Sequence, residues 1–560
     1  MERIKESNAM KTVGELKKVL RQRGLLQENT ENLKNRQALE NDRRCMDLEC
    51  AGSEASYAEP EADPRIDWLT FDSRTVREHT AFICKGAAFR PEYLEAAAQN
   101  GAVCYISETA IEPIETDGAA PLIPLLVTDI RKAMAAASAW FFDYEKGRPI
   151  LTGITGTKGK TTTAWYLKAI LDEWERELGA PETGLISTVE NYDGVSRSES
   201  VMTTPEAPTL HEHILHAKQK GIRYMTMEVS SQALKYRRVR ELQFQVGIFL
   251  NISRDHISPK EHVDFEDYFS SKLSLFRQTE VACVNLNADY ADRILKAAHK
   301  AERIVTFGMK KHADIRCSEI RTEGRHLSFR VTCDRFSERF ELGMRGKFNI
   351  ENALAAITAA YVYGVPVACM RRALRKTLVP GRMETFASSD GRICGIVDFA
   401  HNRLSFEKLF DAAFQEYTAY RRIITVFGCP GGKALNRRRE LGIIAGLFSD
   451  EVILTTDDPG MEDPEGICEE IREYVDMTGC SCHLVADRKK AVEQAVALAK
   501  EDRKNRTLIL LLGRGSERFQ QIGGRSLASP TDAELMAEAL QAYDASRKSG
   551  EASCSGKIAG

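Results

Sequence analysis

Short apolar runs recur along most of the chain, and each is separated from the next by a segment with helical spacing or a high alanine content. Such runs, bounded by glycine or polar residues, are typical of strands buried in parallel sheets. Before residue 150 the pattern covers FDSRTV (71–76), TAFICKG (80–86), YLEAAAQNGAVCYIS (93–107) and LLVTDIRKAMAAASAWFF (125–142). Further strands are predicted at YMTMEVS (224–230), VGIFLNIS (246–253), VACVNLN (281–287), RIVTFG (303–308), RICGIVDFA (392–400), RRIITVFG (421–428), EVILTTD (451–457) and TLILLLG (507–513).

This alternation predicts an α/β protein of three domains, each built on a largely parallel sheet. An amphipathic helix is expected at 11–24 and a poorly ordered polar linker at 27–64. The predicted divisions are residues 1–65 for this leader, 66–148, 149–379 and 380–545 for the domains, and 546–560 for a disordered tail.

Composition narrows the class of protein. A chain of 560 residues, 43% hydrophobic and 28% charged, is too long for one core and suits a multidomain globular protein. Its net charge of −3 gives no argument for a nucleic acid as partner, and no apolar run reaches the roughly 18 residues of a membrane span. The 14 cysteines are scattered without a CxxC pair and the first residues lack a secretion signal, so we expect reduced thiols and a cytoplasmic location.

The segment TGITGTKGKTTTAWYLKAI (152–170) carries the first candidate chemistry. An apolar strand leads into Gly153-x-x-Gly156-x-x-Gly159-Lys160-Thr161, and a helix follows. Amides of a glycine-rich loop and a helix N-terminus bind phosphate, a lysine reaches the β and γ phosphates, and a threonine hydroxyl binds Mg²⁺. Ile154 occupies the first glycine position of the strict GxxxxGK spacing, so an ordinary glycine turn is the alternative. Phosphate binding alone does not distinguish a motor, a kinase and a ligase.

Polar residues also follow other predicted strands. Glu228 ends one apolar run, and Asp255 and His256 end another. Ligands bind at the carboxyl ends of parallel strands, and carboxylates hold Mg²⁺ there. Each cluster taken singly is more simply a solvated loop; together they favour a site.

The order of motifs between about residues 66 and 540 resembles the Mur ligase family, and within it the MurE type, which adds the third residue of the peptidoglycan stem peptide. The motifs are DSRTV (72–76), TGTKGKTTT (155–163), TTPEAPTL (203–210), MEVSSQAL (227–234), RRV (237–239), NISRDH (251–256), KLSLF (272–276), GKFNIENALAA (346–356), PGRME (380–384), VDFAH (397–401), VFGC (426–429), TTDDPGMEDP (455–464), DRKKAV (487–492) and LGRGSE (512–517).

The resemblance implies a UDP-binding N-terminal domain, a central P-loop ATPase domain and a Rossmann-like C-terminal domain that binds an amino acid. ATP would phosphorylate the D-Glu carboxylate of UDP-MurNAc-L-Ala-D-Glu, and the amine of the incoming amino acid would displace the phosphate. A carboxylate has no good leaving group, so the acyl phosphate supplies one, and cations are needed to bring two anions together. We expect a monomer.

The resemblance also implies residue roles. Contacts to the UDP-muramoyl dipeptide are expected from Ser73, Thr203, Thr204, Ser230 and Arg238. Contacts to ATP are expected from Gly156, Thr157, Lys158, Gly159, Lys160, Thr161, Thr162, Asn349, Arg382, Asp398 and His401. Thr161, Glu228 and His256 would hold Mg²⁺, together with Lys272 carried as N6-carboxylysine; a plain surface lysine is the alternative for Lys272. The catalytic set is Lys160, Lys272, His256 and Arg382.

The chain departs from the family's usual residues in several motifs. Lys158 replaces asparagine, Gln232 replaces the histidine of SSHAL, and Ser516 replaces histidine. AHNRLSFEKL (400–409) replaces AHTPDAL, introducing Asn402, and GCPGGKALNRRREL (428–441) lacks the run GDRDKGKR. These changes are compatible with slower catalysis or with a divergent role.

The motif Asp457-Asp458-Pro459-Gly460 indicates which amino acid is the acceptor. Relatives that use meso-diaminopimelate carry DNPR, whose arginine clamps the distal carboxylate. Gly460 has no side chain, whereas Asp458 and Glu517, with Gly513 between them in sequence, suit an ammonium group, so L-lysine is the preferred acceptor. The alternative is diaminopimelate, with Arg437, Arg438, Arg439 or Arg514 as the cation.

Other classes of protein agree less well with these motifs. A folylpolyglutamate synthase or another Mur ligase fits less well because of the DSR and TTP motifs. The changes at Gln232 and Ser516 leave open a non-catalytic Mur-like partner that binds UDP-sugar or ATP. A motor or transport ATPase would need partner domains that the sequence does not show.

Overall fold

The computed structural model describes residues 11–27, 63–86, 89–111, 121–144, 147–258, 261–323, 326–502 and 504–555. They form two compact units. The first unit combines residues 1–149 with 205–219 and 233–242, and the second contains the other residues. Two segments of the predicted central domain therefore belong to the first unit. A domain division by continuous residue ranges cannot describe this arrangement. Most of the expected 27–64 linker lies outside the described residues.

The first unit contains a four-stranded parallel sheet in the order β1-β2-β3-β4. Its strands are β1 (Trp68–Thr70), β2 (Thr80–Ile83), β3 (Ala102–Ser107) and β4 (Ile123–Leu126). Its helices are α1 (Val13–Gln22), α3 (Pro91–Gln99), α4 (Ile130–Phe142) and α6 (Ala207–Gln219), together with the short turn η1 (Ser73–Thr75). The amphipathic helix expected at 11–24 is α1, which begins with a capping box at Thr12 and buries Leu16 and Leu20.

The second unit contains a sheet of eleven strands, which we call the central sheet, in the order β15-β14-β13-β12-β11-β10-β5-β9-β6-β7-β8. Its strands are β5 (Ile150–Thr155), β6 (Gly184–Ile186), β7 (Glu190–Tyr192), β8 (Arg197–Glu199), β9 (Tyr224–Glu228), β10 (Phe244–Phe249), β11 (Thr279–Asn285), β12 (Arg303–Gly308), β13 (Ile315–Glu323), β14 (His326–Thr332) and β15 (Ser337–Leu342). Helices accompanying it are α5 (Lys160–Glu177), α8 (Phe265–Leu273), η2 (Ser274–Gln278), α9 (Ala291–Ala298), α10 (Phe348–Tyr363) and α11 (Val367–Lys376). The short α7 (Ser231–Lys235) follows β9.

A six-stranded sheet, which we call the C-terminal sheet, has the order β16-β17-β21-β18-β19-β20. Its strands are β16 (Glu384–Ala387), β17 (Ile393–Asp398), β18 (Arg422–Phe427), β19 (Glu451–Leu454), β20 (Ser481–Leu484) and β21 (Thr507–Leu512). Its helices are α12 (Arg403–Glu416), α13 (Asn436–Phe448), α14 (Pro464–Asp476), α15 (Arg488–Glu501) and α16 (Asp532–Ser555), and a hairpin joins β22 (Phe519–Ile522) to β23 (Arg525–Ala528).

The long apolar strands are paired in parallel, as the sequence predicts: β5 lies between β9 and β10, and β21 lies between β17 and β18. Both are buried on both faces, which explains the unbroken apolar run Leu508–Leu512 of β21; β5 (ILTGIT) also buries two threonines. Antiparallel pairs occur at the edges, where β13, β14 and β15 form a meander and β16 pairs with β17. The alternating polar residues of β15 (SERFEL) give this meander a weak apolar signal.

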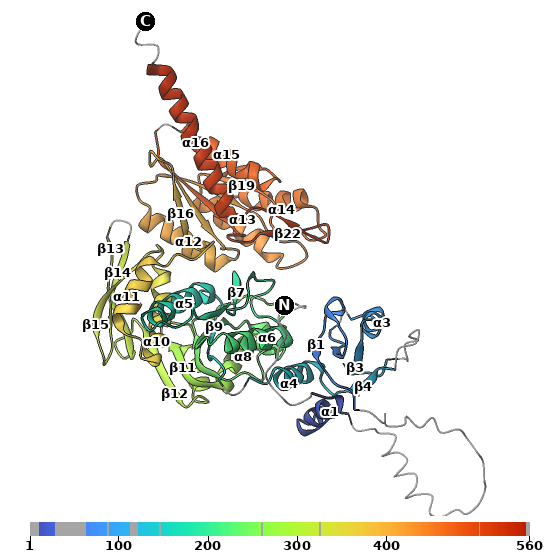
Figure 1. Cartoon of the computed structure of the whole chain (residues 1–560). Coiled ribbons are helices and arrows are strands. Elements are labelled where there is room, and N and C mark those ends of the chain that lie inside the picture. The colour runs from blue at the N-terminus through green and yellow to red at the C-terminus, as the bar shows by residue number, and fades with distance from the viewer. Residues whose placement is uncertain are drawn as a thin grey trace, which may run out of the picture. The chain divides into compact units, whose positions relative to one another are not determined.

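The expected disordered tail after residue 545 is wrong for residues 546–555. Helix α16 runs to Ser555, and its earlier part lies beside α15 (Figure 1). Tyr543 donates to Asp390 at 2.9 Å, and Arg547 pairs with the same carboxylate. A helix nucleated on packed residues extends readily through alanine, arginine, lysine and glutamate.

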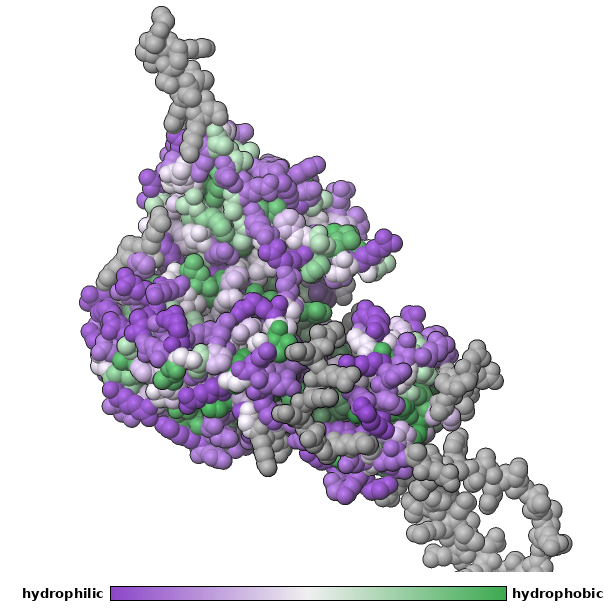
Figure 2. Space-filling model, viewed as in Figure 1, coloured by the Kyte–Doolittle hydropathy of each residue, from purple (hydrophilic) through white to green (hydrophobic). Residues whose placement is uncertain are grey.

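On the face shown in Figure 2, hydrophobic residues are scattered among hydrophilic ones. Among the described residues, no helix combines the length and the apolar character that crossing a membrane requires.

Candidate active site

The glycine-rich loop lies between β5 and α5, as predicted. Gly159 precedes the helix with φ of 86°, and a Cβ there would overlap the Asn352 side chain. Gly156 is equally confined, since a Cβ would lie 2.9 Å from Leu250 Cβ. The loop therefore requires glycine both for backbone conformation and for close approach. The first-turn amides of α5 have no acceptor within the helix, which suits this turn to a phosphate.

Lys160 folds back over its own loop. Its Nζ donates to Gly156 O at 2.9 Å and Thr157 O at 3.1 Å. Burial lowers the pKa of Lys160, against the attraction of Glu228 and Asp255. An anion in the loop would restore the preference for the ammonium form.

Arg382 reaches this loop from the segment that leads into β16. Its Nη2 donates to Thr161 Oγ1 at 3.4 Å, and its guanidinium lies 4.5 Å from the centre of the Phe399 ring. Burial lowers the pKa of Arg382 while Asp398, Glu228 and Glu517 raise it. A second cation is thus brought to the threonine that is predicted to hold Mg²⁺.

Glu228 ends β9 and is fully buried. Its Oε1 accepts from Thr188 N at 2.8 Å, and Thr188 Oγ1 lies within hydrogen-bonding distance of Oε2, at 3.3 Å, and of Thr203 Oγ1, at 3.1 Å. Thr204 Oγ1 donates to Glu228 O at 2.9 Å and accepts from Ser230 N at 3.1 Å. The predicted metal carboxylate and the predicted dipeptide contacts Thr203, Thr204 and Ser230 therefore form one hydrogen-bonded group.

His256 is oriented by a carboxylate that the sequence did not indicate. Its Nδ1–H donates to Glu261 Oε1 at 2.8 Å, which directs the lone pair of the neutral ring to Nε2. Gln232 Nε2 donates to the same Glu261 oxygen at 3.3 Å. A histidine held by a carboxylate at one nitrogen is the usual arrangement for a metal ligand at the other.

Lys272 is a buried amine, so the surface alternative is excluded. It is 2% exposed, its Nζ donates to Gly156 O at 2.9 Å, and it lies 4.8 Å from the centre of the Tyr268 ring. Burial, followed by repulsion from Lys160, holds the pKa of Lys272 well below its usual value. A neutral amine is the form that reacts with CO₂, so the residue fits a carbamate.

The remaining predicted nucleotide residues lie at helix and strand ends. Asn349, in the first turn of α10, donates to Arg345 O at 2.7 Å and accepts from Asn352 at 3.0 Å. Asp398, at the end of β17, accepts from Met383 N at 2.8 Å, and burial raises the pKa of its carboxyl. His401 Nδ1–H donates to Phe399 O at 2.7 Å, and burial keeps its pKa well below the usual value. Thr157 Oγ1 accepts from Ser253 N at 3.0 Å, and Thr162 is buried in α5.

Two predicted dipeptide contacts, Ser73 and Arg238, belong to the first unit. Ser73 begins η1, where the Asp72 side chain accepts from Arg74 N at 3.0 Å. Arg238 pairs with Glu206 at 2.9 Å, and Lys85 pairs with the same carboxylate at 2.6 Å. This buried carboxylate, which the sequence did not single out, positions both cations.

The predicted acceptor residues follow β19 and β21. Burial, with added repulsion from Asp457 and Asp458, raises the pKa of Glu517 to about 8. Burial also raises the pKa of Asp457 to about 6. Asp457 Oδ2 lies 2.7 Å from where a Cβ on Gly513 would be, so glycine is needed beside this carboxylate. Asp458 Oδ1 accepts from Gln521 N at 3.1 Å. A set of three carboxylates, one more than predicted, thus lies at the ends of these strands.

Residues in the motifs that depart from the family's usual sequence have defined contacts or backbone conformations. Gly460 has φ of 62°, a backbone conformation that disfavours the arginine found there in diaminopimelate users. Arg437 pairs with Asp255 at 3.2 Å, and Arg438 pairs with Glu462 at 2.5 Å and with Glu470. Arg514 is 1% exposed and donates to Phe519 O at 2.8 Å. The backbone nitrogen of Ser516 lies so close to Gly381 that a Cβ added to Gly381 would be 2.4 Å from it.

Sequence reasoning missed Thr188, Glu261, Glu206 and Asp457. No quoted motif contains Thr188 or Glu261, and Glu206 lies in TTPEAPTL without a predicted role, because the contacts of all three residues form only on folding. Asp457 is adjacent to a predicted residue, and its position at the end of a buried strand was the available signal.

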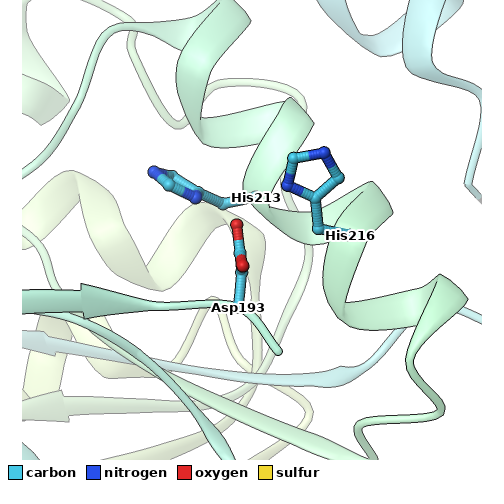
Figure 3. A group of neighbouring side chains, drawn as sticks. All are labelled: Asp193, His213 and His216. Carbon is cyan, nitrogen blue, oxygen red and sulfur yellow. The ribbon is translucent and has the colours of Figure 1, made fainter. Parts of the chain in front are cut away.

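Two histidines outside the predicted set, His213 and His216, lie one turn apart on α6 in the first unit (Figure 3). Asp193, which follows β7, belongs to the second unit, where its Oδ1 accepts from Val195 N at 2.9 Å and Ser196 N at 2.7 Å. No metal site is assigned to these residues.

Comparison with known proteins agrees with this fold. Residues 154–360 match the Mur ligase middle domain, and residues 381–515 match the Mur ligase glutamate ligase domain. The chain is 35% identical over 497 residues to UDP-N-acetylmuramyl-tripeptide synthetase of Lactobacillus delbrueckii subsp. bulgaricus, covering 85% of this chain and 93% of that protein. It is 36% identical over 465 residues to UDP-N-acetylmuramoyl-L-alanyl-D-glutamate--L-lysine ligase of Enterococcus faecalis, covering 81% and 88%.

A solved structure of UDP-N-acetylmuramoyl-L-alanyl-D-glutamate--2,6-diaminopimelate ligase superposes with a TM-score of 0.57 at 24% identity, covering 86% of this chain and 95% of that one. At this identity the likeness shows the fold alone. The fold and the phosphate loop define an ATP-dependent acid–amino-acid ligase, and the chain belongs to the Mur ligase family. Within that family it resembles the MurE type, so the resemblance seen in the motifs is confirmed.

Proposed function

We propose that this enzyme uses ATP to join L-lysine to UDP-MurNAc-L-Ala-D-Glu, in the cytoplasm, as a step of peptidoglycan synthesis. The observation that carries the choice of acceptor is the charge at the ends of β19 and β21. Asp457, Asp458 and Glu517 form an acidic group there, and the mutual repulsion of Glu517 with the two aspartates is relieved when an ammonium binds.

Three of the four arginines that could serve diaminopimelate have other partners. Arg437 and Arg438 are paired with carboxylates, and the described contacts of Arg514 include backbone carbonyl oxygens. Gly460 supplies no guanidinium. Two relatives, of Enterococcus faecalis at 36% identity and of Streptococcus suis at 33%, are named L-lysine ligases.

The proposed chemistry assigns a task to each buried group. Lys160 and Arg382 neutralise the phosphates, so that the nucleotide and the D-Glu carboxylate, both anions, can approach. Thr203, Thr204 and Ser230 orient the dipeptide, and Ser73 and Arg238 are further proposed contacts of the UDP-muramoyl dipeptide. Glu517 and Asp458 hold the side-chain ammonium of lysine, which leaves its α-amine to displace the phosphate.

The residues also fit Mg²⁺. Glu228 is a buried carboxylate beside the loop, Thr161 offers a hydroxyl, and His256 has one nitrogen directed by Glu261. A neutral Lys272 would complete the set as a carbamate. When bound, Mg²⁺ would stabilise negative charge on the phosphoryl oxygens.

Phosphate release tests the proposal. Full-length protein would be given Mg-ATP and UDP-MurNAc-L-Ala-D-Glu, with L-lysine, L-ornithine or meso-diaminopimelate in separate reactions, and product masses would be measured. We expect phosphate and a tripeptide product with L-lysine. Faster turnover with diaminopimelate would overturn the acceptor assignment, and no acceptor-dependent phosphate at all would favour a non-catalytic Mur-like protein.

A further inference from the structure

Asp255 receives groups from both sheets of the second unit. It follows β10 of the central sheet, and its side chain is 7% exposed. Asn402 Nδ2 donates to Asp255 Oδ2 at 2.7 Å, and Arg437 donates to Oδ1 at 3.2 Å. Both donors accompany the C-terminal sheet, so one carboxylate binds two of its helices.

The same carboxylate attracts the phosphate loop. Lys158 Nζ lies 3.7 Å from Asp255 Oδ2 and 3.4 Å from His401 Nε2. Because the Nδ1–H of His401 donates to a backbone carbonyl, Nε2 carries a lone pair and accepts from the ammonium. Through His401, Lys158 therefore also connects the loop directly to the C-terminal sheet.

The groups around Asp255 are held in place locally. Asn251 fixes the Lys158 backbone, accepting from Lys158 N at 2.9 Å and donating to Lys158 O at 3.1 Å. Asn402 is the N-cap of α12, where its Oδ1 accepts from Ser405 N at 3.1 Å. Arg437 lies in the first turn of α13. Since two helix N-termini lie beside the carboxylate, their dipoles also favour its charge.

A second link between the two sheets involves backbone amides. Glu416, at the end of α12, accepts from Gly346 N at 2.8 Å and Lys347 N at 2.9 Å, just before α10. This link has no side chain in the phosphate loop. Of the two, the Asp255 link is the one that an anion in the loop can influence, because the anion competes for Lys158.

We propose that Asp255 is a positioning residue that docks the C-terminal sheet on the phosphate loop and sets the place of Lys158 for the nucleotide. Burial opposes the charge on Asp255, but the surrounding cations outweigh it and hold its pKa below the usual range. Two departures noted in the sequence, Lys158 and the loop after His401, thereby meet at one carboxylate together with Arg437, and these groups act as a single arrangement.

A double-mutant cycle tests the docking. Asp255→Asn keeps the shape and removes the charge, and Arg437→Met removes one partner. We expect each to lower kcat about 30-fold, because each removes one charge of the buried pair Asp255–Arg437. The double variant should be no more than about twofold slower than the slower single variant, since both remove one link. Losses that multiply would show that the two residues act separately and would overturn the proposal.

Two kinetic controls separate positioning from other roles. Arg437→Lys, which keeps the charge, should retain at least about a third of wild-type kcat. The Mg²⁺ concentration for half-maximal rate should be unchanged in Asp255→Asn; a large increase would show action through the neighbouring His256 and would overturn the proposal. Arg403→Met, on the exposed side of the α12 start, should match wild type.

Hydrogen exchange supplies a readout that does not need turnover or a known acceptor. The proposal rests on the nucleotide site of the proposed ligase, not on lysine as its acceptor. In full-length protein, amides at 402–405 and 436–441 should exchange several-fold faster in Asp255→Asn than in wild type, with no change in Arg403→Met. A non-hydrolysable ATP analogue should slow them in wild type. Unchanged exchange in Asp255→Asn would overturn the proposal even if the lysine assignment holds.

Discussion

The phosphate loop and the acidic group at the ends of β19 and β21 are both buried, but they carry opposite charge. At the loop, burial lowers the pKa of the amines of Lys160 and Lys272. At the acidic group, burial raises the pKa of Asp457 to about 6 and of Glu517 to about 8. In each region burial therefore shifts the pKa toward the neutral form, and a bound charge of the other sign would favour the ionised form.

The comparison shows how one enzyme accommodates two unlike substrates. A phosphate entering the loop and an ammonium entering the acidic group each restore the ionised form of the residues that bind them. Arg382 is sensitive to both regions, since Glu228 and Glu517 both raise its pKa against the effect of burial. The substrates thus complete the electrostatics that the chain leaves incomplete.

Removing the loop cation should have the largest effect. Lys160→Met should lower kcat/KM for ATP about a thousand-fold, because charge developing on the phosphates loses its buried partner. Phosphate release measures this change. Arg176→Met, at the exposed end of the same helix, is the matched control. Retention of more than a tenth of the activity would contradict the role given to the loop.

Fixing a charge at Lys272 should be the next most harmful change. Lys272→Arg cannot form a carbamate and places a permanent cation near Lys160, so kcat should fall about 100-fold. In wild type, labelled bicarbonate should give a carbamate signal in carbon NMR that this variant lacks. A signal of equal size in the variant would place the carbamate on another lysine.

At the acidic group, neutralising Glu517 should change acceptor binding selectively. Glu517→Gln should raise the KM for L-lysine about 30-fold and leave the KM for ATP unchanged. Steady-state kinetics with each substrate varied in turn distinguishes the two. Arg525→Gln, on the exposed hairpin, serves as control. Equal increases in both KM values would mean that the variant disturbs the whole site.

The pH dependence follows from the same carboxyl group. With a pKa of about 8, Glu517 is mostly protonated at about pH 7 in the enzyme without acceptor, and it ionises as pH rises through 8. The KM for L-lysine should therefore fall about tenfold between about pH 7 and pH 9. The Glu517→Gln variant should lose this slope. A KM that rises over this range would contradict an ionised Glu517 as the ammonium partner.

The raised pKa of Glu517 also predicts how the stability of the folded protein changes with pH. It lies above the ordinary value of 4.5, so the folded state keeps a proton that the unfolded state releases, and stability falls as pH rises from about 4.5 to about 8. Glu517→Gln should flatten this decline in thermal unfolding measured across that range. An unchanged decline would show that other groups cause it.

Gln232→Ala should have the smallest effect. It removes one hydrogen bond of 3.3 Å to Glu261, while the bond between Glu261 and His256 remains. A threefold decrease in kcat, about 0.7 kcal/mol, is expected. A decrease of two orders of magnitude would mean that Gln232 contacts a substrate.

Sequence patterns predicted the buried parallel strands and the phosphate loop because both depend on local order. An apolar run between turns has few alternatives to a buried strand. The strands β9, β12, β17, β18, β19 and β21 lie within their predicted segments, and β10 and β11 begin two residues before theirs. The β13–β15 meander and the helical tail to Ser555 were not predicted, because polar edge strands and small polar helices lack an apolar pattern.

The amino-acid sequence by itself determined the family, the glycines of the loop and the identity of the charged residues that follow the strands. Tertiary structure decided which of those charges meet. Glu261 lies five residues from His256, yet only folding shows that it orients this ring, and Asp255 meets Arg437 across 182 residues of sequence. The reason is physical: the pKa of a buried group and the partner of a buried charge depend on burial and on distances in space, which residue spacing along the chain does not contain.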